Sequence, residues 1–268
     1  MEMVILFILG IAIGAFGTLV GIGGGLIMIP LFVLLMTGSL AAPAGFFNTF
    51  HNVSQAVGTS LFGVFLNTLS GSFAYIRQKR VYFDAALPFA AATLPGAFLG
   101  SYADEYFSGG IFDFVFGGML VMLAGVMYWK SSAPKALAKE FDPKHFVYPK
   151  KLGILISVFV GFLSSVLGIG GGIIHVPLMI YVLSFPPHVA TATSHFVLAV
   201  SSFVGCISHF ILGHIVWKPA IGIGFGAVIG AQIGAVISQK TRPRVIVILL
   251  SIVMCGLGLK LIFLSNVL

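Results

Sequence analysis

Long apolar runs separated by short polar segments make up most of this chain. No Asp, Glu, Lys or Arg occurs between Glu2 and Arg77, or from Leu152 to Trp217. A hydrocarbon core about 30 Å thick requires ~20 apolar residues for each helical crossing, so each run is long enough for several crossings. The runs do not alternate as barrel strands do, and helices satisfy their own backbone groups in lipid. The pattern predicts an all-α polytopic membrane protein.

The two halves of the chain carry related sequences. Residues 17–31 (GTLVGIGGGLIMIPL) and 164–178 (SSVLGIGGGIIHVPL) are identical at eight of fifteen positions, at an offset of 147. Further matches follow in the same order at an offset of 134, so the first half has 13 additional residues within 36–55. This ordered self-similarity indicates an internal duplication. The later matches pair 56–60 with 190–194, 81–83 with 215–217, and 96–100 with 230–234.

Each half is expected to have the same layout. A long apolar run interrupted by GIGGG, 3–36 or 153–184, precedes three simpler spans. The pieces beside the glycines are short for full crossings, so each interrupted run is predicted to be a re-entrant segment or a hairpin. The expected order is a first membrane repeat (1–130), a cytoplasmic linker (131–152) and a second membrane repeat (153–268). The simpler spans are predicted at 52–76, 84–103 and 111–130, and at 188–212, 219–239 and 245–266.

Basic residues predict the orientation. Cytoplasmic segments of membrane proteins are enriched in Lys and Arg. This rule places the linker and segments 77–80 and 240–244 on the cytoplasmic side, together with 12 of the 14 basic residues, if 153–184 crosses an even number of times. Each half then crosses an odd number of times, so the repeats are inverted. Both termini, and the acidic segment 104–106, are expected outside the cytoplasm of a protein in the inner membrane.

The GIGGG stretches are the first candidate site. Inverted repeats with broken helices are typical of secondary transporters, whose substrates bind where half-helix ends meet. A half-helix after each glycine turn would point free N–H groups and a positive dipole end at an anion. The alternative is a packing seam of small residues. The predicted substrate-binding glycines are Gly21, Gly23, Gly24 and Gly25, with Gly168, Gly170, Gly171 and Gly172 in the second half.

Paired hydroxyls form the second candidate group. Thr59 and Ser60 match Thr193 and Ser194 at the offset of 134. Hydroxyl groups can donate to an oxyanion without adding charge. The alternative is a bond back to the carbonyl of the preceding helical turn, which is common for Ser and Thr within spans. Their occurrence in both halves keeps the binding role open.

Histidines within the apolar runs are candidates for proton coupling. An ionisable residue inside a membrane indicates function, and histidine can take up a proton near neutral pH. His175 stands where the first half has Met28, and His195 stands where it has Leu61. The alternative for each is a neutral imidazole that is hydrogen-bonded within the bundle. No Asp or Glu lies deep within a span, which favours an anionic substrate over a cation.

Other classes of function have little support in the sequence. The net charge of +7 comes from basic residues in short inter-span segments, so topology explains it without nucleic acid. The sequence shows no set of nucleophile, base and orienting group that would indicate an enzyme. Cys206 and Cys255 form no CxxC motif, and neither a metal site nor a cofactor is predicted. The expected partners are the lipid bilayer and a small anion, and a dimer is possible without support from the sequence.

These motifs resemble a known family. The paired GIGGG-x4-P-L stretches, the Ala-x-x-Thr-Ser of 56–60 and 190–194, and the glycine-rich 96–100 and 230–234 are similar to those of the TauE/SafE sulfite exporters. The resemblance covers nearly the whole chain. It implies export of sulfite, sulfoacetate or another small organosulfur anion, coupled to protons. This agrees with a helix-end anion site.

A secondary transporter of a small sulfur oxyanion is therefore the leading hypothesis. One alternative is a membrane haem or redox protein, because His195 and His209 lie 14 residues apart on one predicted helix. A partner helix with similar spacing is missing from the sequence. A passive anion channel is the other alternative, which the sequence leaves open.

Overall fold

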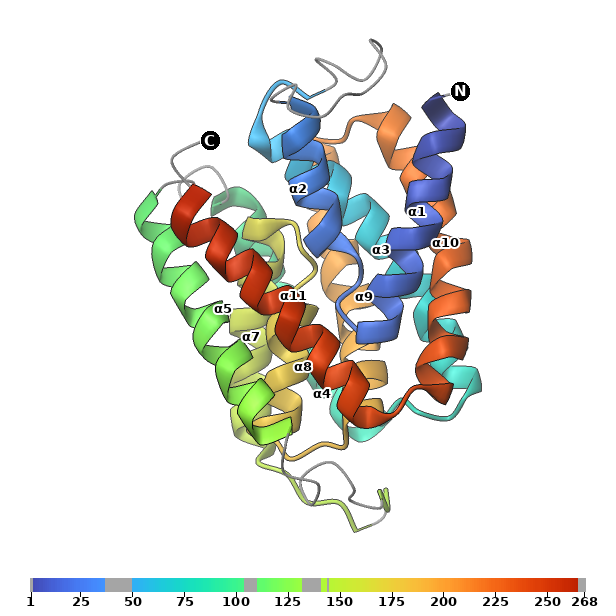
Figure 1. The fold of residues 1–268 in the computed structure, drawn as a ribbon, viewed down its shortest axis with the longest axis vertical. Coiled ribbons are helices and arrows are strands. Elements are labelled where there is room, and N and C mark those ends of the chain that lie inside the picture. Colours follow the sequence, from blue (N-terminus) through green and yellow to red (C-terminus); the bar gives the residue numbers. More distant parts are fainter. Residues whose placement is uncertain (1, 37–49, 104–109, 132–140, 144, 265–268) are drawn as a thin grey trace.

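The computed structural model describes residues 2–36, 50–103, 110–131, 141–143 and 145–264, and the regular structure within them is entirely helical (Figure 1). Six of the described helices are long and apolar enough to cross a membrane. The predicted all-α polytopic membrane fold is confirmed. The helices are α1 (Glu2–Val20), α2 (Gly25–Met36), α3 (Val53–Arg77), α4 (Phe83–Ala103), α5 (Gly110–Ser131), α7 (Lys150–Leu167), α8 (Gly172–Tyr181), α9 (Pro187–Ile211), α10 (Trp217–Lys240) and α11 (Pro243–Leu264).

Two short helices follow the glycine turns. α2 has 12 residues and α8 has 10. At 1.5 Å per residue these helices are about 18 and 15 Å long, well short of the ~30 Å hydrocarbon core. The break predicted at each GIGGG is therefore present, and each interrupted run ends in a half-length helix. Most of the additional residues of the first half, the acidic segment 104–106 and most of the linker lie outside the described residues.

The two halves interlock instead of packing as separate bundles. α1 of the first half lies along α10 of the second, and α7 of the second lies along α4 of the first. A Cβ placed on Gly230 of α10 would lie 2.2 Å from the Ile11 carbonyl oxygen of α1, and one on Gly96 of α4 would lie 2.1 Å from that of Val158 of α7. The matched glycine-rich stretches thus permit matched close contacts. This reciprocity agrees with the predicted twofold relation between the halves.

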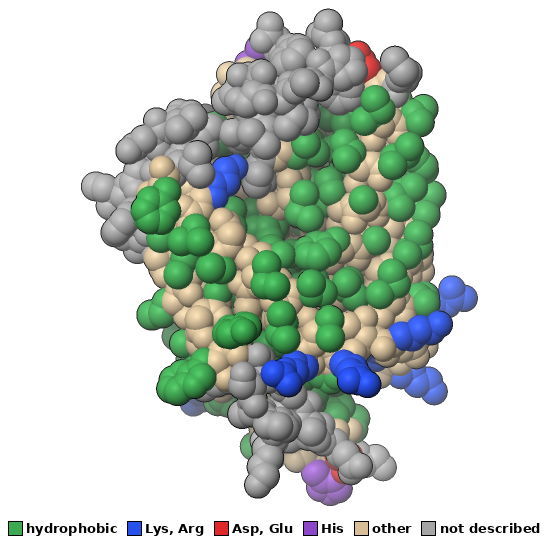
Figure 2. Space-filling view, in the orientation of Figure 1, with side chains coloured by type: hydrophobic (Ala, Val, Ile, Leu, Met, Phe, Trp, Pro, Cys, Tyr) green, Lys and Arg blue, Asp and Glu red, His purple; other side chains and the backbone are tan. Residues whose placement is uncertain are grey.

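The ends of the helices separate the charges. α1 begins and α11 ends at the upper end of Figure 1, whereas α7 begins at the lower end. Lys and Arg side chains gather towards the lower end of the face in Figure 2. The basic residues that end α3 and α10 or begin α7 and α11 account for this grouping. These chain directions agree with an odd number of membrane crossings in each half. The side of the membrane to which each end belongs stays a prediction.

Candidate functional site

The two glycine turns have the same backbone conformation. Gly21, Gly23 and Gly24 have φ angles of 85°, 79° and 82°, and their counterparts Gly168, Gly170 and Gly171 have 65°, 81° and 68°. A side chain at such φ values is strained, so glycine at these six positions is what allows the chain to reverse between the long and the short helix. The repeated sequence therefore encodes a repeated turn.

The fourth glycine of each stretch has a different role, because it touches the opposite turn. A Cβ on Gly25 would lie 2.7 Å from the Ile169 Cα and 2.8 Å from the Gly168 carbonyl oxygen. A Cβ on Gly172 would lie 2.5 Å from the Gly21 carbonyl oxygen. The structure thus brings the two sets of predicted glycines together. The first residue of each short helix packs against the glycine turn of the other half.

Free backbone amides occur at the start of both short helices. The first bonds that close α2 run from the Ile27 and Met28 amides to the Gly24 carbonyl, and those of α8 from the Ile174 and His175 amides to the Gly171 carbonyl. The amides that precede them in each helix have no helical acceptor, as at any helix N-terminus. Two positive helix ends thus meet inside the bundle with no acidic side chain in either turn.

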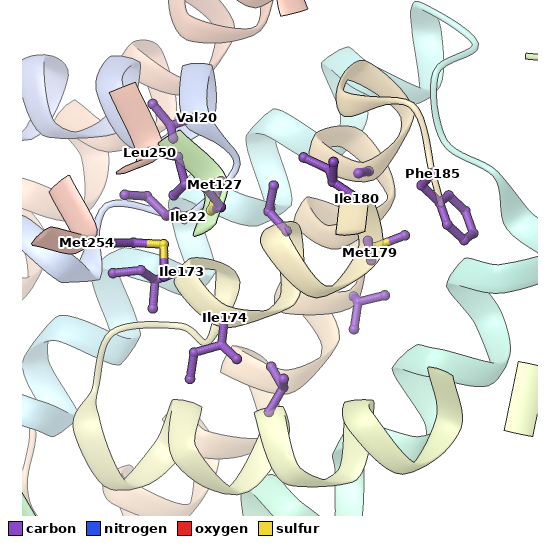
Figure 3. Close-up of a cluster of buried hydrophobic side chains, with 14 of the residues drawn as sticks. Val20, Ile22, Met127, Ile173, Ile174, Met179, Ile180, Phe185, Leu250 and Met254 are labelled. Carbon is purple, nitrogen blue, oxygen red and sulfur yellow. The ribbon is translucent and has the colours of Figure 1, made fainter. Parts of the chain in front are cut away.

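Buried apolar side chains surround these turns. Ile22 of the first turn and Ile173 of α8 belong to one cluster with Met127 of α5 and with Leu250 and Met254 of α11 (Figure 3). Hydrogen bonds and helix dipoles act more strongly in such a low-dielectric setting than in water. The surrounding apolar side chains therefore strengthen any hydrogen bond that the backbone amides of the turns donate to a ligand.

The predicted threonines hold the connections between helices. Thr59 Oγ1 accepts a hydrogen bond from the Val216 amide at 3.0 Å, and Thr193 Oγ1 accepts one from the Tyr82 amide at 3.1 Å. Both threonines are buried. The two bonds are matched across the halves, and each ties the start of a helix in one half to a helix of the other.

The predicted serines lie nearer to the glycine turns. Ser60 Oγ donates to the Gly168 carbonyl oxygen at 2.8 Å, which links α3 to the turn of the second half. Its counterpart Ser194 lies 3.2 Å from His175 Nδ1. Of the four predicted hydroxyls, that of Ser60 is hydrogen-bonded to a glycine turn. Ser60 and Ser194 thus have different partners although their positions in the two halves match.

The imidazole of His175 is fully paired. Ser157 Oγ donates to the Gly153 carbonyl at 2.8 Å, so at the 3.4 Å contact His175 Nε2 must be the donor to Ser157. His175 Nδ1 is then the acceptor for Ser194. A neutral, buried histidine with both nitrogens bonded fits the structural alternative that the sequence left open.

His195 has an unpaired nitrogen. Thr18 Oγ1 donates its single proton to Asn67 Oδ1 at 3.2 Å, so at the 3.4 Å contact His195 Nε2 is the donor to Thr18. His195 Nδ1 then carries a lone pair, and it is buried without a hydrogen-bond partner. Its ring meets Tyr75 edge to face at 5.5 Å between centroids. His195 therefore has a free acceptor atom, whereas both ring nitrogens of His175 are bonded.

The polar residues around His195 were not among the predicted site residues. Asn67 Nδ2 donates to the carbonyls of Gly14 and Ala227, and so joins α3 to α1 and α10. The Tyr75 hydroxyl donates to the Thr18 carbonyl at 2.5 Å. Thr18 matches Ser165 at the offset of 147. Comparing every matched pair for hydroxyl groups would have revealed Thr18, whereas Asn67 and Tyr75 have no such signal.

Arg80 caps this group of polar residues at the basic end of the bundle. Its guanidinium lies 4.8 Å from the centre of the Tyr75 ring and donates to the His188 carbonyl and Ser238 Oγ at 3.3 and 3.2 Å. Burial lowers the pKa of the Arg80 guanidinium, and the interaction with Tyr75 partly offsets this. A half-buried arginine thus stands at the lower end of a polar chain that leads through Tyr75 and Thr18 to the first glycine turn.

Comparison with known proteins identifies the family. The family model of the sulfite exporter TauE/SafE matches residues 6–261. The chain belongs to the TauE/SafE family. Nearly every residue of the two interlocked halves lies within the match, so the resemblance noted in the glycine motifs is confirmed.

Relatives within the TauE/SafE family have similar lengths. A probable membrane transporter protein of Bacillus subtilis, YunE, is 34% identical over 276 residues, which cover 98% of each chain. A probable membrane transporter protein of Haemophilus influenzae is 30% identical over 93% of this chain and 91% of its own. One from Methanocaldococcus jannaschii is 28% identical over 95% and 93%. The search of solved structures gave no significant match.

Proposed function

We propose that the chain is a secondary transporter that exports a small sulfur oxyanion, sulfite or an organosulfonate, with proton coupling. The observation that carries the proposal is the meeting of two helix N-termini, α2 and α8, inside an apolar bundle. Their free amides and dipole ends favour an anion and supply donors for its oxygens. The described neighbours of the turns are backbone, aliphatic and hydroxyl groups, which present no charge that competes with an anion.

Substrate binding on this proposal requires the turns to separate. Gly25 and Gly172 leave no room for a methyl group against the opposite turn, so an oxyanion enters between them only when they move apart. Ser60 then exchanges its bond to the Gly168 carbonyl for one to the anion. On this proposal the closed turns belong to an occluded state, and opening towards one end at a time would give alternating access.

His195 is the proposed proton carrier near this site. Its unpaired Nδ1 is buried beside Thr18, which lies three residues before Gly21 at the end of α1. A proton there would add a positive charge next to the first glycine turn. Anion and proton would therefore stabilise each other in the bound state. His175 remains the second candidate, although its two nitrogens are already paired.

Flux measurements in proteoliposomes test the proposal. Purified protein is reconstituted, and labelled sulfite is followed with and without an imposed pH gradient. We expect saturable flux that responds to the gradient and is abolished by Gly24→Leu and by Gly171→Leu, because both positions need a positive φ. Gly125→Leu is the matched control, since no atom lies within 4 Å of an added Cβ there.

The outcomes separate the candidate functions. Flux that does not saturate and ignores the proton gradient would indicate a passive channel. Flux unchanged by both turn variants would place the anion site elsewhere. Thermal shifts with sulfite, methanesulfonate and sulfate identify the preferred class of anion, because a ligand that binds the folded state raises the midpoint of unfolding.

A further inference from the structure

A second polar cluster lies at the opposite end of the bundle from Arg80. His209, near the end of α9, and His214, in the connection to α10, have their Nδ1 atoms 3.1 Å apart and their ring centroids 5.3 Å apart. His209 is fully buried and His214 is half-buried. This end also holds Lys218, bonded to Glu2. The histidine pair is not used in the function proposed above.

Two buried polar atoms beside this pair have no partner. The backbone of Ser165 in α7 lies beside the His209 imidazole, within reach of a long hydrogen bond. The side-chain atoms His209 Nε2 and Ser165 Oγ are each buried without a hydrogen bond of ordinary geometry. Ser165 Oγ faces α9 at Gly205, where an added Cβ would lie 2.9 Å from it. Buried polar groups in native proteins are almost always paired, so two adjacent exceptions indicate a site for a ligand.

The cluster is the counterpart of the polar chain at the basic end. At the offset of 134, His209 matches Tyr75 and His214 matches Arg80, and at the offset of 147 Ser165 matches Thr18. In the first set a permanent cation stands over the aromatic ring. In the second set a titratable imidazole occupies the place of that cation. The two ends of one path thus differ in whether their positive charge depends on pH.

The cluster also reaches the second glycine turn. Ser165 precedes Gly168 by three residues, as Thr18 precedes Gly21. A Cβ on Gly58 of α3 would lie 3.0 Å from the His209 Cβ, and the neighbouring Val57 Cα would lie 2.9 Å from a Cβ on Gly168. The His209 side chain therefore packs against α3 one residue from the contact between α3 and the second glycine turn.

We propose that His209, His214 and Ser165 form a second anion site that binds an oxyanion together with one proton. The inference rests on the proposed function and names the proton that accompanies the anion at this end. The contact between the two Nδ1 atoms requires one ring to donate and the other to accept. When the pair gains a proton on His209, Nδ1–H donates to His214, and Nε2–H and the Ser165 hydroxyl both become donors to the anion. The proton comes from water at the upper end and leaves with the anion.

The described neighbours of the histidine pair include no other group that would take up the proposed proton. Cys206 lies one turn earlier on α9, packed against Ile215 and Ala220. α3 presents Gly58, and α7 presents Ser165. Lys218 of α10 is bonded to Glu2 of α1, and His51, before α3, is exposed. The contacts recorded for the described residues thus bring no carboxylate to the pair, so a bound anion is the charge that compensates the proton.

Calorimetry in two buffers of different ionisation enthalpy tests this site. The probe is methanesulfonate, whose charge does not change near neutral pH, and sulfite is the second probe. We expect this site to take up about one proton per bound anion, in addition to the proton assigned to His195, so that its affinity falls about tenfold per pH unit once the pair has lost its proton. His209→Gln and His214→Gln remove this share of the uptake and keep the share assigned to His195. His51→Gln is the matched control, and it keeps the uptake.

A symmetry variant separates this role from a structural one. His214→Arg introduces the residue that the first half has at this position. We expect it to retain methanesulfonate affinity but to lose the proton uptake and the pH dependence of this site, since its charge is permanent. Unchanged uptake in His209→Gln and His214→Arg would overturn the inference and leave sulfite transport standing.

A protein that binds neither probe would contradict the proposed function, and the pair is then tested by itself. Imidazole nuclear magnetic resonance signals of labelled histidine are followed against pH in the wild type, His209→Gln and His51→Gln. A titrating signal that is lost in His209→Gln alone upholds the protonation site. The same set of signals in His209→Gln and the wild type would sink it.

Discussion

Thr68 Oγ1 and Ser202 Oγ lie 3.3 Å apart, and these residues occupy the same position in the two halves. Residues related by a twofold axis can contact each other only close to that axis, so the predicted axis runs through the crossing of α3 and α9. A Cβ on Gly23 would lie 2.9 Å from the Thr68 Cγ2, which places the glycine turns beside the same axis. The hydroxyl pair is thus a landmark for the centre of the proposed path.

The contact between the turns makes Gly25 and Gly172 sensitive to one methyl group. Gly25→Ala and Gly172→Ala are each expected to destabilise the protein by about 1–3 kcal/mol, because the new Cβ meets the backbone of the opposite turn. Thermal unfolding in detergent measures the effect. Gly125→Ala in α5 is the control, where an added Cβ meets nothing within 4 Å and should be neutral or stabilising. Equal midpoints for all variants would show that the turns do not touch.

Thr193 distinguishes a structural hydroxyl from one that binds substrate. Thr193→Val leaves the Tyr82 amide without its acceptor, and we expect a loss of about 1–3 kcal/mol in unfolding free energy. Thr193→Ser keeps the acceptor and should restore most of the stability. The comparison is made by thermal unfolding together with sulfite flux. A valine variant of wild-type stability that has lost flux would assign the hydroxyl to the anion.

Arg80 should not tolerate lysine. Its guanidinium bonds to Gln78, His188 and Ser238 at once, and an ammonium cannot reproduce this planar fork. Arg80→Lys is expected to cost about 1.5–3 kcal/mol, the range for hydrogen bonds to charged groups, and to slow anion entry from the basic end.

Arg77→Lys is the matched control for Arg80→Lys, because Arg77 is exposed in the same segment and its replacement should stay within about 0.5 kcal/mol. Chemical unfolding and initial rates of sulfite flux are compared for both variants. Equal effects of the two substitutions would remove Arg80 from the path.

The predicted orientation can be read with reporters. A phosphatase fused after Leu268 should be active outside the cytoplasm and a fluorescent protein dark, whereas fusions after Lys130 should give the opposite result. A cytoplasmic C-terminus would reverse the assignment of the basic end and with it the side on which Arg80 meets its anion.

Patterns that repeat along the chain were sufficient to predict the helices and their breaks. Apolar runs predicted the helices, and the position of GIGGG predicted the breaks, because positive φ angles leave a strong signature in the sequence. The contact of Gly25 with the turn at Gly168 could not be predicted in the same way, since it depends on how the two halves pack.

The polar contacts were harder to foresee. Thr59 and Thr193 were predicted from their pairing, but their acceptor role depends on where Val216 and Tyr82 come to lie. The difference between a paired His175 and a half-paired His195 rests on single hydroxyl protons of Ser157 and Thr18. Interactions of this kind follow from the tertiary arrangement and leave no periodic trace.

The interlocking of the halves has a consequence for biogenesis. α1 is synthesised first, yet its partner α10 leaves the ribosome some two hundred residues later. Until then the glycine-lined face of α1 is exposed to lipid or to the insertion machinery, so neither repeat is a folding unit that can mature alone. Two separately expressed halves should therefore accumulate only when they are made together in the same cell.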